Sequence, residues 1–267
     1  AMSARRLRRI ASHCTPLPPP PAADAAPAPA AGDGERHGGR LLVQSLLAHN
    51  VDRVFAVPGE SYLAVLDGLY DAPSVEVVIC RQEGGAAMMA EADGKLKGTP
   101  GVAMVTRAPG ATNASAGVHI AFQDSTPMVL LVGQVGRSMF DREAFQEVDY
   151  RKMFGPGVGL AKAAFEINAP ERIPEYMNRA FALACSGRPG PVVLALPEDV
   201  LSSVMAEEPA VPLPASPTAP NPDPAAIAEL GGRIVRSPAA PQPAALLPSP
   251  NASGARVCLA GQAAAQR

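Results

Sequence analysis

The chain has 267 residues, with 23 Lys and Arg against 25 Asp and Glu, and a formal net charge of −2 at pH 7. This near balance creates no strong field of one sign, so we expect neither a nucleic-acid partner nor a membrane partner. No run of the sequence is long and apolar enough to cross a bilayer.

The 30 Pro residues divide the chain, because they gather in residues 16–29, 209–224 and 238–250. We therefore expect four parts: a disordered tail at 1–37, a folded domain at 38–204, a Pro-rich linker at 205–224, and a truncated or frame-shifted start of a further domain, poorly ordered, at 225–267. The Arg-rich first residues favour a basic tail over an organelle transit peptide. The four Cys residues have no metal-ligand spacing, so we expect no metal site and a cytoplasmic location.

Within residues 38–204, apolar runs and helical periodicities alternate along the chain. The patterns predict helices at 40–49, 62–70, 83–97, 111–123 and 173–185. They predict strands at 53–57, 75–80, 101–106, 128–132, 161–167 and 191–196, and a further helix begins near 223–234. Short apolar strands between helices indicate an α/β fold: a three-layer α/β/α domain whose mainly parallel six-stranded sheet is buried on both faces.

Glu83 is the first candidate for chemistry. It follows the strand 75–80 and opens a helix of small residues, Gly84-Gly85-Ala86-Ala87. That position is the carboxyl edge of a parallel sheet, where ligands bind. The alternative is that Glu83 only offsets the dipole of its helix, as acids in a first turn commonly do.

Further segments strengthen the first interpretation by their order and spacing. They are Thr106-Arg107-Ala108-Pro109-Gly110-Ala111-Thr112-Asn113, Phe122-Gln123-Asp124-Ser125-Thr126-Pro127, Gly133-Gln134-Val135, Ala144-Phe145-Gln146-Glu147 and Gly187-Arg188-Pro189-Gly190-Pro191. With Glu83 they resemble the N-terminal, pyrimidine-binding domain of thiamine-diphosphate-dependent enzymes of the acetolactate synthase type, over residues 38–200.

The resemblance implies roles for particular residues. Glu83 would be the catalytic acid that contacts N1′ of the coenzyme's aminopyrimidine ring and favours its imino tautomer. Pro109, Gly110 and Asn113 would shape the pyrimidine side of the site. The substrate channel would be lined by Gly59, Glu60, Gln123, Gln134, Phe145 and Gln146, although simple packing explains Phe145 equally well.

The resemblance also implies cofactors and partners. Thiamine diphosphate would be bound with Mg²⁺ held through a diphosphate domain that this chain lacks, while FAD is possible but unsupported. The substrate would be a small 2-keto acid or an acyl compound in a carboligase or decarboxylase reaction. The chain would form a homodimer, or a hetero-oligomer with a diphosphate-binding chain. The alternatives are a non-catalytic subunit, an inactive fragment or a scaffold module.

Four residues depart from the acetolactate synthase pattern. Glu60 stands where a second Gly is usual, Gln82 where His is usual, and Arg107-Ala108 where Ser-Gly is usual. Glu60 and Arg107 introduce charge at a mouth that is otherwise small and neutral. Another 2-keto acid or an acyl substrate therefore stays open beside acetohydroxyacid synthesis.

Overall fold

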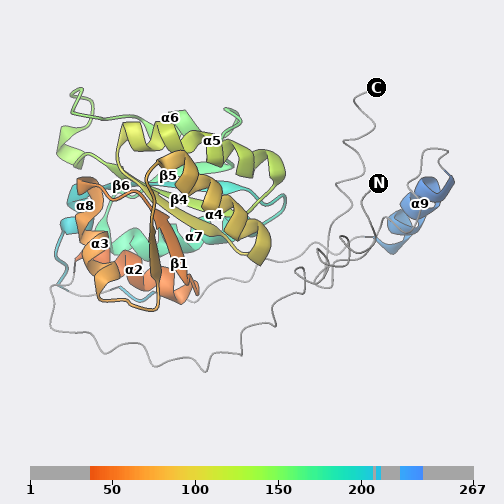
Figure 1. Ribbon diagram of the computed structural model, residues 1–267, viewed down its shortest axis with the longest axis horizontal. Helices are drawn as coiled ribbons and strands as arrows, with labels where there is room; N and C mark the ends of the chain where they lie inside the picture. The colour runs from red at the N-terminus through yellow and green to blue at the C-terminus, as the bar shows by residue number, and fades with distance from the viewer. Residues whose placement is uncertain (1–36, 207–208, 212–222, 237–267) are drawn as a thin grey trace, which may run out of the picture. The chain divides into compact units, whose positions relative to one another are not determined.

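The computed structural model describes residues 37–206, 209–211 and 223–236 (Figure 1). The predictions for the N-terminal tail and for residues 237–267 lie outside the described residues, as does most of the linker. Residues 37–206 form a six-stranded sheet in the order β2-β1-β3-β4-β6-β5, with every neighbouring pair parallel. Helices cover both faces of this sheet. The predicted three-layer α/β/α class is confirmed.

The elements follow the predicted order. The strands are β1 (Arg53–Ala56), β2 (Glu76–Ile79), β3 (Gly101–Val105), β4 (Met128–Gln134), β5 (Ala163–Glu166) and β6 (Pro191–Pro197). The helices are α2 (Gly38–Ala48), α3 (Leu63–Tyr70), α4 (Glu83–Lys97), α5 (Ala108–Asp124), α6 (Tyr150–Phe154), α7 (Ile173–Cys185), α8 (Glu198–Ser202) and α9 (Pro224–Arg236). Short 3₁₀ turns occupy Glu60–Tyr62, Arg137–Met139 and Pro170–Arg172.

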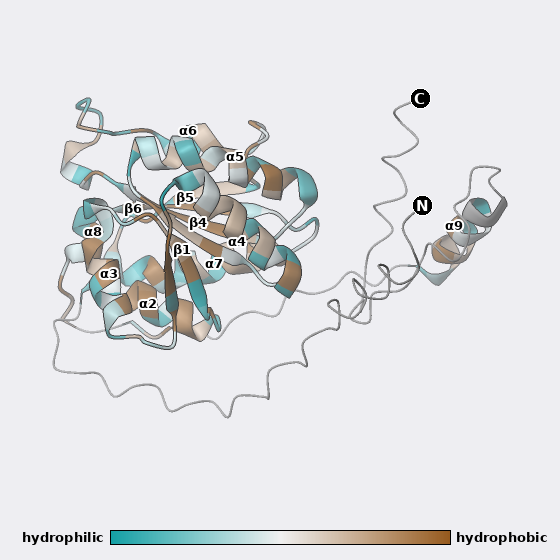
Figure 2. Cartoon of the chain, viewed as in Figure 1, coloured by the Kyte–Doolittle hydropathy of each residue, from teal (hydrophilic) through white to brown (hydrophobic). Residues whose placement is uncertain are grey.

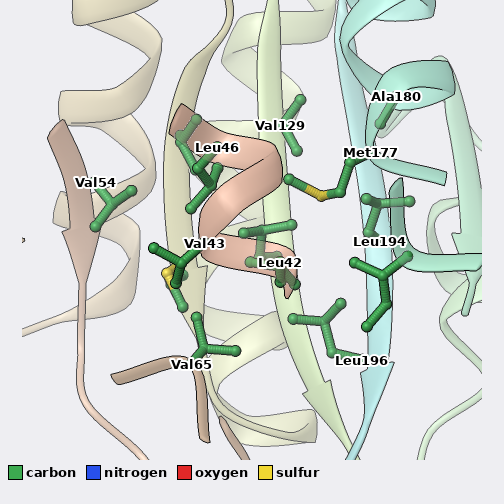
Figure 3. Packing of buried hydrophobic residues seen from close by; sticks show 14 of the residues in the cluster. Leu42, Val43, Leu46, Val54, Val65, Val129, Met177, Ala180, Leu194 and Leu196 are labelled. Atoms are coloured by element: carbon green, nitrogen blue, oxygen red, sulfur yellow. The ribbon is translucent and has the colours of Figure 1, made fainter. Parts of the chain in front are cut away.

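Alternate residues of the central strands enter two separate cores, because successive side chains of a strand point to opposite faces. Val129 and Leu131 of β4 pack with α2, α3 and α7, together with Leu194 of β6. Leu130 and Val132 pack on the other side with α4, α5 and α6. Figure 3 shows Leu42, Leu46 and Met177 facing the first set of strand residues. Figure 2 shows the same strands as the most hydrophobic part of the domain.

Small residues let α4 and α5 approach each other closely. A Cβ added at Gly117 of α5 would lie 2.5 Å from the Cβ of Ala87 and 2.8 Å from two backbone atoms of α4. Ala86, Ala90, Ala114 and Ala121 are fully buried in the same layer. The tight contact fixes the relative position of the two helices that carry Glu83 and Asn113.

The edge strand β2 differs from the sequence prediction. The prediction buried every strand on both faces, but Glu76 and Ile79 are exposed and Val77 and Val78 are half-buried. β2 pairs only with β1 among the described residues, so one of its sides has no neighbouring strand.

The helix α9 confirms the helix predicted near 223–234. Asp223 accepts a hydrogen bond from the backbone N–H of Ala225 at 3.0 Å, and Pro224 occupies the first turn, where its missing N–H costs nothing. Among the described residues, no helix combines the length and the apolar character needed to cross a membrane.

Candidate functional site

The strand order places a switch point between β1 and β3. The chain leaves β1 for α3 on one face of the sheet and leaves β3 for α5 on the other. In open α/β sheets, the loops at such a point diverge and form a crevice at the carboxyl ends of the strands. Here those loops carry Gly59, Glu60 and residues 106–108, and the adjacent β2 delivers Glu83.

Glu83 lies in the first turn of α4. The preceding Gln82 caps the helix, its Oε1 accepting a hydrogen bond from the backbone N–H of Gly85 at 2.8 Å. Asn113 of α5 donates from Nδ2 to Oε2 of Glu83 at 3.0 Å. The structure therefore brings together the predicted catalytic acid and one predicted cofactor contact. It also shows what the sequence did not reveal: Gln82 is the cap, and Asn113 orients the acid.

Gly110 lies beside Glu83: a Cβ added there would lie 3.7 Å from Oε1 of the carboxylate, an ordinary contact distance, and 3.2 Å from Cγ2 of Thr106. Pro109, one residue earlier, is exposed in the first turn of α5. One oxygen of the Glu83 carboxyl group is held by Asn113, and the other lies next to Gly110, which has no side chain. This arrangement fits the flat, nitrogen-containing edge of an aminopyrimidine ring. The residues present therefore suit the predicted coenzyme.

Tyr62 is a buried neighbour of Glu83 that sequence reasoning missed. Its hydroxyl donates to the carbonyl oxygen of Val57 at the end of β1. Burial, and secondarily the negative charge of Glu83, raise the pKa of the Tyr62 hydroxyl. Tyr62 therefore stays neutral at physiological pH and lies buried beside the end of β1.

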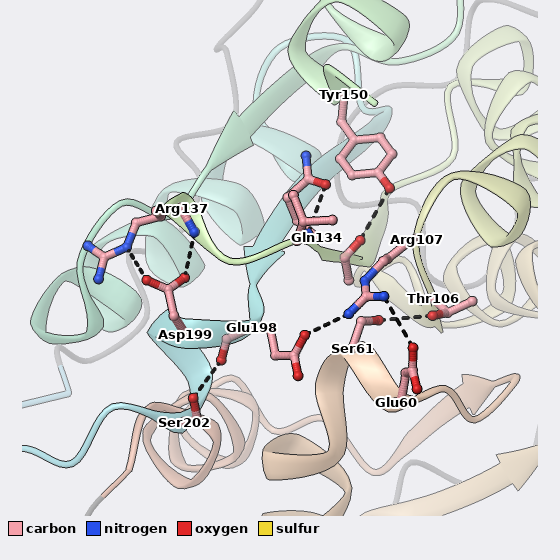
Figure 4. Close-up of polar contacts among 12 residues, drawn as sticks. Glu60, Ser61, Thr106, Arg107, Gln134, Arg137, Tyr150, Glu198, Asp199 and Ser202 are labelled. Atoms are coloured by element: carbon pink, nitrogen blue, oxygen red, sulfur yellow. Dashed lines mark hydrogen bonds and ion pairs between the residues drawn. The ribbon is translucent and has the colours of Figure 1, made fainter. Parts of the chain in front are cut away.

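Arg107 bridges two carboxylates across the carboxyl edge (Figure 4). Its Nη1 lies 3.2 Å from Oε1 of Glu60, and its Nη2 lies 2.6 Å from Oε2 of Glu198. The Arg107 side chain is only 11% exposed, whereas those of Glu60 and Glu198 are 71% and 49% exposed. The guanidinium lies beneath the two acids, so the surface offered to a ligand is the pair of carboxylates.

Gly59 and Ser61 pack against Thr106 next to this bridge. A Cβ at Gly59 would come within 2.5 Å of the Thr106 Cβ, and the hydroxyl oxygens of Ser61 and Thr106 are 2.9 Å apart. Gly59, a predicted channel residue, is thus a packing position in which only a glycine fits without a shift of its neighbour. The role of Glu198 was not predicted, because it is 91 positions from Arg107 in the sequence.

Gln134 and the loop after it form a rigid support. Gln134 is 2% exposed, donates from Nε2 to the carbonyl oxygen of Val148 at 2.8 Å and accepts at Oε1 from the N–H of Val135. The carbonyl oxygen of Gln146 accepts from the N–H of Ala108 at 3.2 Å, which ties the loop to the start of α5. Phe145 is 75% exposed on this loop, so it is not packed in the core of this chain.

Gln123 is the predicted channel residue that the structure does not bring to this edge. It lies next to the last residue of the 17-residue helix α5, whose first turn holds Pro109 and Gly110. A helix of that length spans about 26 Å. Gln123 is therefore at the amino edge of the sheet, at the far end of α5 from Glu83.

Glu166 at the end of β5 is the acid with a raised pKa near this edge. Burial raises its pKa, and the positive charge of Arg151 and a hydrogen bond from Gln134 partly offset that effect. Burial also raises the pKa of the neighbouring Tyr150, whose hydroxyl donates to the carbonyl oxygen of Gly133 at 3.2 Å (Figure 4). The described residues hold no cluster of three or more His, Cys, Asp or Glu side chains arranged for a metal ion.

Comparison with known proteins gives a consistent result. Residues 36–153 match the family described as thiamine pyrophosphate enzyme, N-terminal TPP binding domain. Acetolactate synthase isozyme 3 large subunit of Escherichia coli (strain K12) is 41% identical over 165 residues, which cover 62% of this chain and 28% of that protein. The mitochondrial acetolactate synthase catalytic subunit of Saccharomyces cerevisiae is 37% identical over 184 residues, covering 69% of this chain and 26% of the relative.

The probable acetolactate synthase large subunit of Methanocaldococcus jannaschii is 39% identical over 163 residues, or 61% of this chain and 27% of that protein. The chain thus spans well under a third of the length of the curated relatives it matches. The family match includes Glu83, Gly110 and Asn113, which lie together at the carboxyl edge of the sheet. Residues 36–153 are therefore similar to the N-terminal TPP-binding domain of thiamine pyrophosphate enzymes, and the chain is similar over about 165 residues to acetolactate synthases.

Proposed function

We propose that this chain supplies the pyrimidine-side half of a thiamine-diphosphate site in a carboligase or decarboxylase that acts on a small 2-keto acid. The observation that carries the proposal is the Glu83 carboxylate, anchored by Asn113 and placed beside the open backbone of Gly110. The whole reaction needs a diphosphate-binding domain with Mg²⁺, which lies outside the described residues or in a separate chain. An inactive or non-catalytic subunit is the alternative for the chain alone.

The two carboxylate oxygens of Glu83 have different tasks in this proposal. Oε2 accepts the hydrogen bond from Asn113, which fixes the plane of the carboxyl group. Oε1 faces Gly110, and no hydrogen bond from the described residues engages it, so it can share a proton with a ring nitrogen. The bound coenzyme would supply the electron sink for making or breaking a bond next to a carbonyl group, while the protein supplies orientation and electrostatics.

The outer faces of α4 and α5 support an assembled state. Met88, Met89 and Ile120 on these helices are 44%, 39% and 37% exposed, and Leu96 is 88% exposed. Grouped apolar side chains on a surface commonly mark a contact with another domain or chain. We infer that this face is covered in a homodimer or in a hetero-oligomer that brings the diphosphate-binding half to Glu83.

The substrate and the location belong to the same proposal. The charged bridge formed by Arg107, Glu60 and Glu198 departs from a neutral mouth, so another 2-keto acid or an acyl substrate stays open beside acetohydroxyacid synthesis. Cys80 and Cys185 are both free thiols, which is consistent with a reducing, cytoplasmic compartment.

The test compares the native protein with Glu83→Gln in the presence of thiamine diphosphate, Mg²⁺ and a co-purified or co-expressed diphosphate-domain chain. Deuterium exchange at C2 of the thiazolium ring, followed by NMR, should fall at least a hundredfold, because a neutral amide cannot share a proton with the ring nitrogen. Glu76→Gln on the exposed β2 is the matched control and should leave exchange unchanged. Equal exchange rates in the Glu83 variant and the native protein would disprove the assignment.

A further inference from the structure

A hollow of about 330 Å³ lies at the amino edge of the sheet, opposite the edge that carries Glu83. It is lined by Phe122 near the end of α5, by Lys162 just before β5, and by the turn of residues 186–190 between α7 and β6. The coenzyme site uses none of these residues.

Two cations line this hollow, and both donate hydrogen bonds to neutral oxygens. Lys162 Nζ donates to the carbonyl oxygens of Leu183 and Ser186, each at 2.5 Å. Arg188 donates from Nε to the Ser125 hydroxyl at 2.8 Å and from Nη2 to the carbonyl oxygens of Phe122 and Gln123, each at 3.1 Å. These bonds hold both positive groups in place at the ends of α5 and α7.

Neither cation has a carboxylate partner among the described residues. Lys95, Lys97 and Arg107 each lie within 4.0 Å of two carboxylates, whereas neither Lys162 nor Arg188 forms an ion pair with a described carboxylate. The carbonyl ends of the two helices offset part of the charge, equivalent to about half an elementary charge each. An excess of positive charge therefore remains at the hollow. Burial lowers the pKa of Lys162, as expected for a cation that no carboxylate neutralises.

Donors remain free around the same hollow. The described residues provide no hydrogen-bond partner for Nη1 of Arg188 or for the backbone N–H groups of Gly187 and Arg188. Gly187 has a φ of +55°, which turns the backbone so that successive N–H groups sit on a tight loop. Arg188 also stacks over the Phe122 ring, with its guanidinium carbon 5.5 Å from the ring centre, and this contact fixes the plane of the guanidinium.

We propose that this hollow binds a small oxyanion, a phosphate or carboxylate group, with Arg188 and the turn at residues 187–188 as hydrogen-bond donors and Lys162 as a fixed positive charge. Because Nε and Nη2 of Arg188 are already bonded, Nη1 is the guanidinium nitrogen left to donate, and such a bond to an oxyanion is strengthened by the opposite charges. The site would serve a ligand other than the coenzyme, and the inference does not depend on the proposed function.

The experiment titrates the ¹⁵N-labelled chain with inorganic phosphate and, separately, with acetate, at constant ionic strength so that screening does not change. We expect saturable shifts of the Gly187 and Arg188 amide signals, with dissociation constants in the millimolar range. Arg188→Gln should weaken binding at least tenfold. Lys162→Met removes the positive charge and should also weaken binding, but it also removes the hydrogen bonds to the carbonyl oxygens of Leu183 and Ser186. If that variant does not fold, the exposed Arg188 carries the test.

Arg172→Gln is the matched control, because it makes the same change on a guanidinium that is paired with Glu175. It should leave the titration unchanged. Saturation by phosphate alone would identify a phosphate site, and saturation by both ions a general oxyanion site; both support the proposal. No saturable shift at residues 187–188, or equal affinity in Arg188→Gln and the native chain, would overturn it.

Discussion

The Glu83 carboxylate receives a hydrogen bond from Asn113, which lies on a different helix. This contact orients the acid toward Gly110 without neutralising it, because an amide donor carries no charge. The position of the acid therefore depends on a side chain that is itself exposed and contributes little to the core.

Asn113→Ala should separate orientation from folding. A hydrogen bond to a charged group contributes about 1.5–3 kcal/mol when buried and less when exposed, so we expect thiazolium C2 exchange in the assembled protein to fall roughly fivefold to tenfold. Urea unfolding of the chain should stay within about 0.5 kcal/mol of the native value. Thr112→Ala, the exposed neighbour on α5, is the control. A rate equal to that of the native protein would show that Asn113 does not position Glu83.

Glu166 gives a pH-dependent prediction. Its pKa in the folded chain is raised above the ordinary 4.5, mainly by burial, so ionisation disfavours the folded state. Stability from this residue is complete below pH 4.5 and is lost as the pH rises through the folded-state pKa. Glu166→Gln should therefore be more stable than the native chain at pH 7, and this advantage should shrink toward pH 4.5. Urea midpoints at both pH values test this, with the exposed Glu171→Gln as control; an advantage independent of pH would contradict it.

At the scale of the elements, the close packing of α4 on α5 depends on Gly117. A larger side chain at Gly117 would collide with the backbone of α4. Because the interior is closely packed, the two helices could not move apart without losing other contacts.

Gly117→Val should destabilise the chain by about 1–3 kcal/mol in urea unfolding, through overpacking between the two helices. Ala116→Val adds the same branched side chain on the exposed face of α5 and should cost only about 0.5 kcal/mol. If both variants lost the same stability, helix propensity and not the α4–α5 contact would explain the effect.

Periodicity alone predicted the elements well, because each apolar run and each helical stripe is a local property. The predicted start of α5 at 111 was late: the helix begins at Ala108, since Pro109 fits a first turn. The predicted burial of β2 was wrong because strand order decides which strand is the edge, and order is not a local property.

The same distinction explains the site. Glu83 could be predicted, because a strand end followed by a small-residue helix is visible in the sequence. The bond from Asn113 and the bridge from Arg107 to Glu198 could not, because they depend on how helices and strands far apart in the chain are brought together. Gln123 was assigned to the channel by the resemblance, whereas the length of α5 places it at the opposite edge of the sheet.

At the scale of the whole molecule, the exposed side chains of α4 and α5 determine what the domain can join. Met88→Glu should leave the unfolding of the isolated chain unchanged, because this side chain is already 44% exposed. It should abolish stable association with a diphosphate-binding partner in size-exclusion chromatography, since a charge would be buried in an apolar contact. Tyr70→Glu on α3, 88% exposed on the opposite face of the sheet, is the control. Association that survives Met88→Glu would place the interface elsewhere.

Among the strands of the described residues, β6 is the last to be synthesised, and it lies between β4 and β5, which are synthesised before it. During synthesis, the backbone N–H and C=O groups of β4 and β5 that pair with β6 therefore stay unpaired until residues 191–197 have left the ribosome. Open edges invite pairing with other chains, so a nascent chain stalled before Pro191 should be a substrate for chaperones. When β6 pairs with β4 and β5, Glu198 at its end also reaches Arg107. The edge of the sheet that carries the Arg107 bridge is therefore among the last parts of the domain to form.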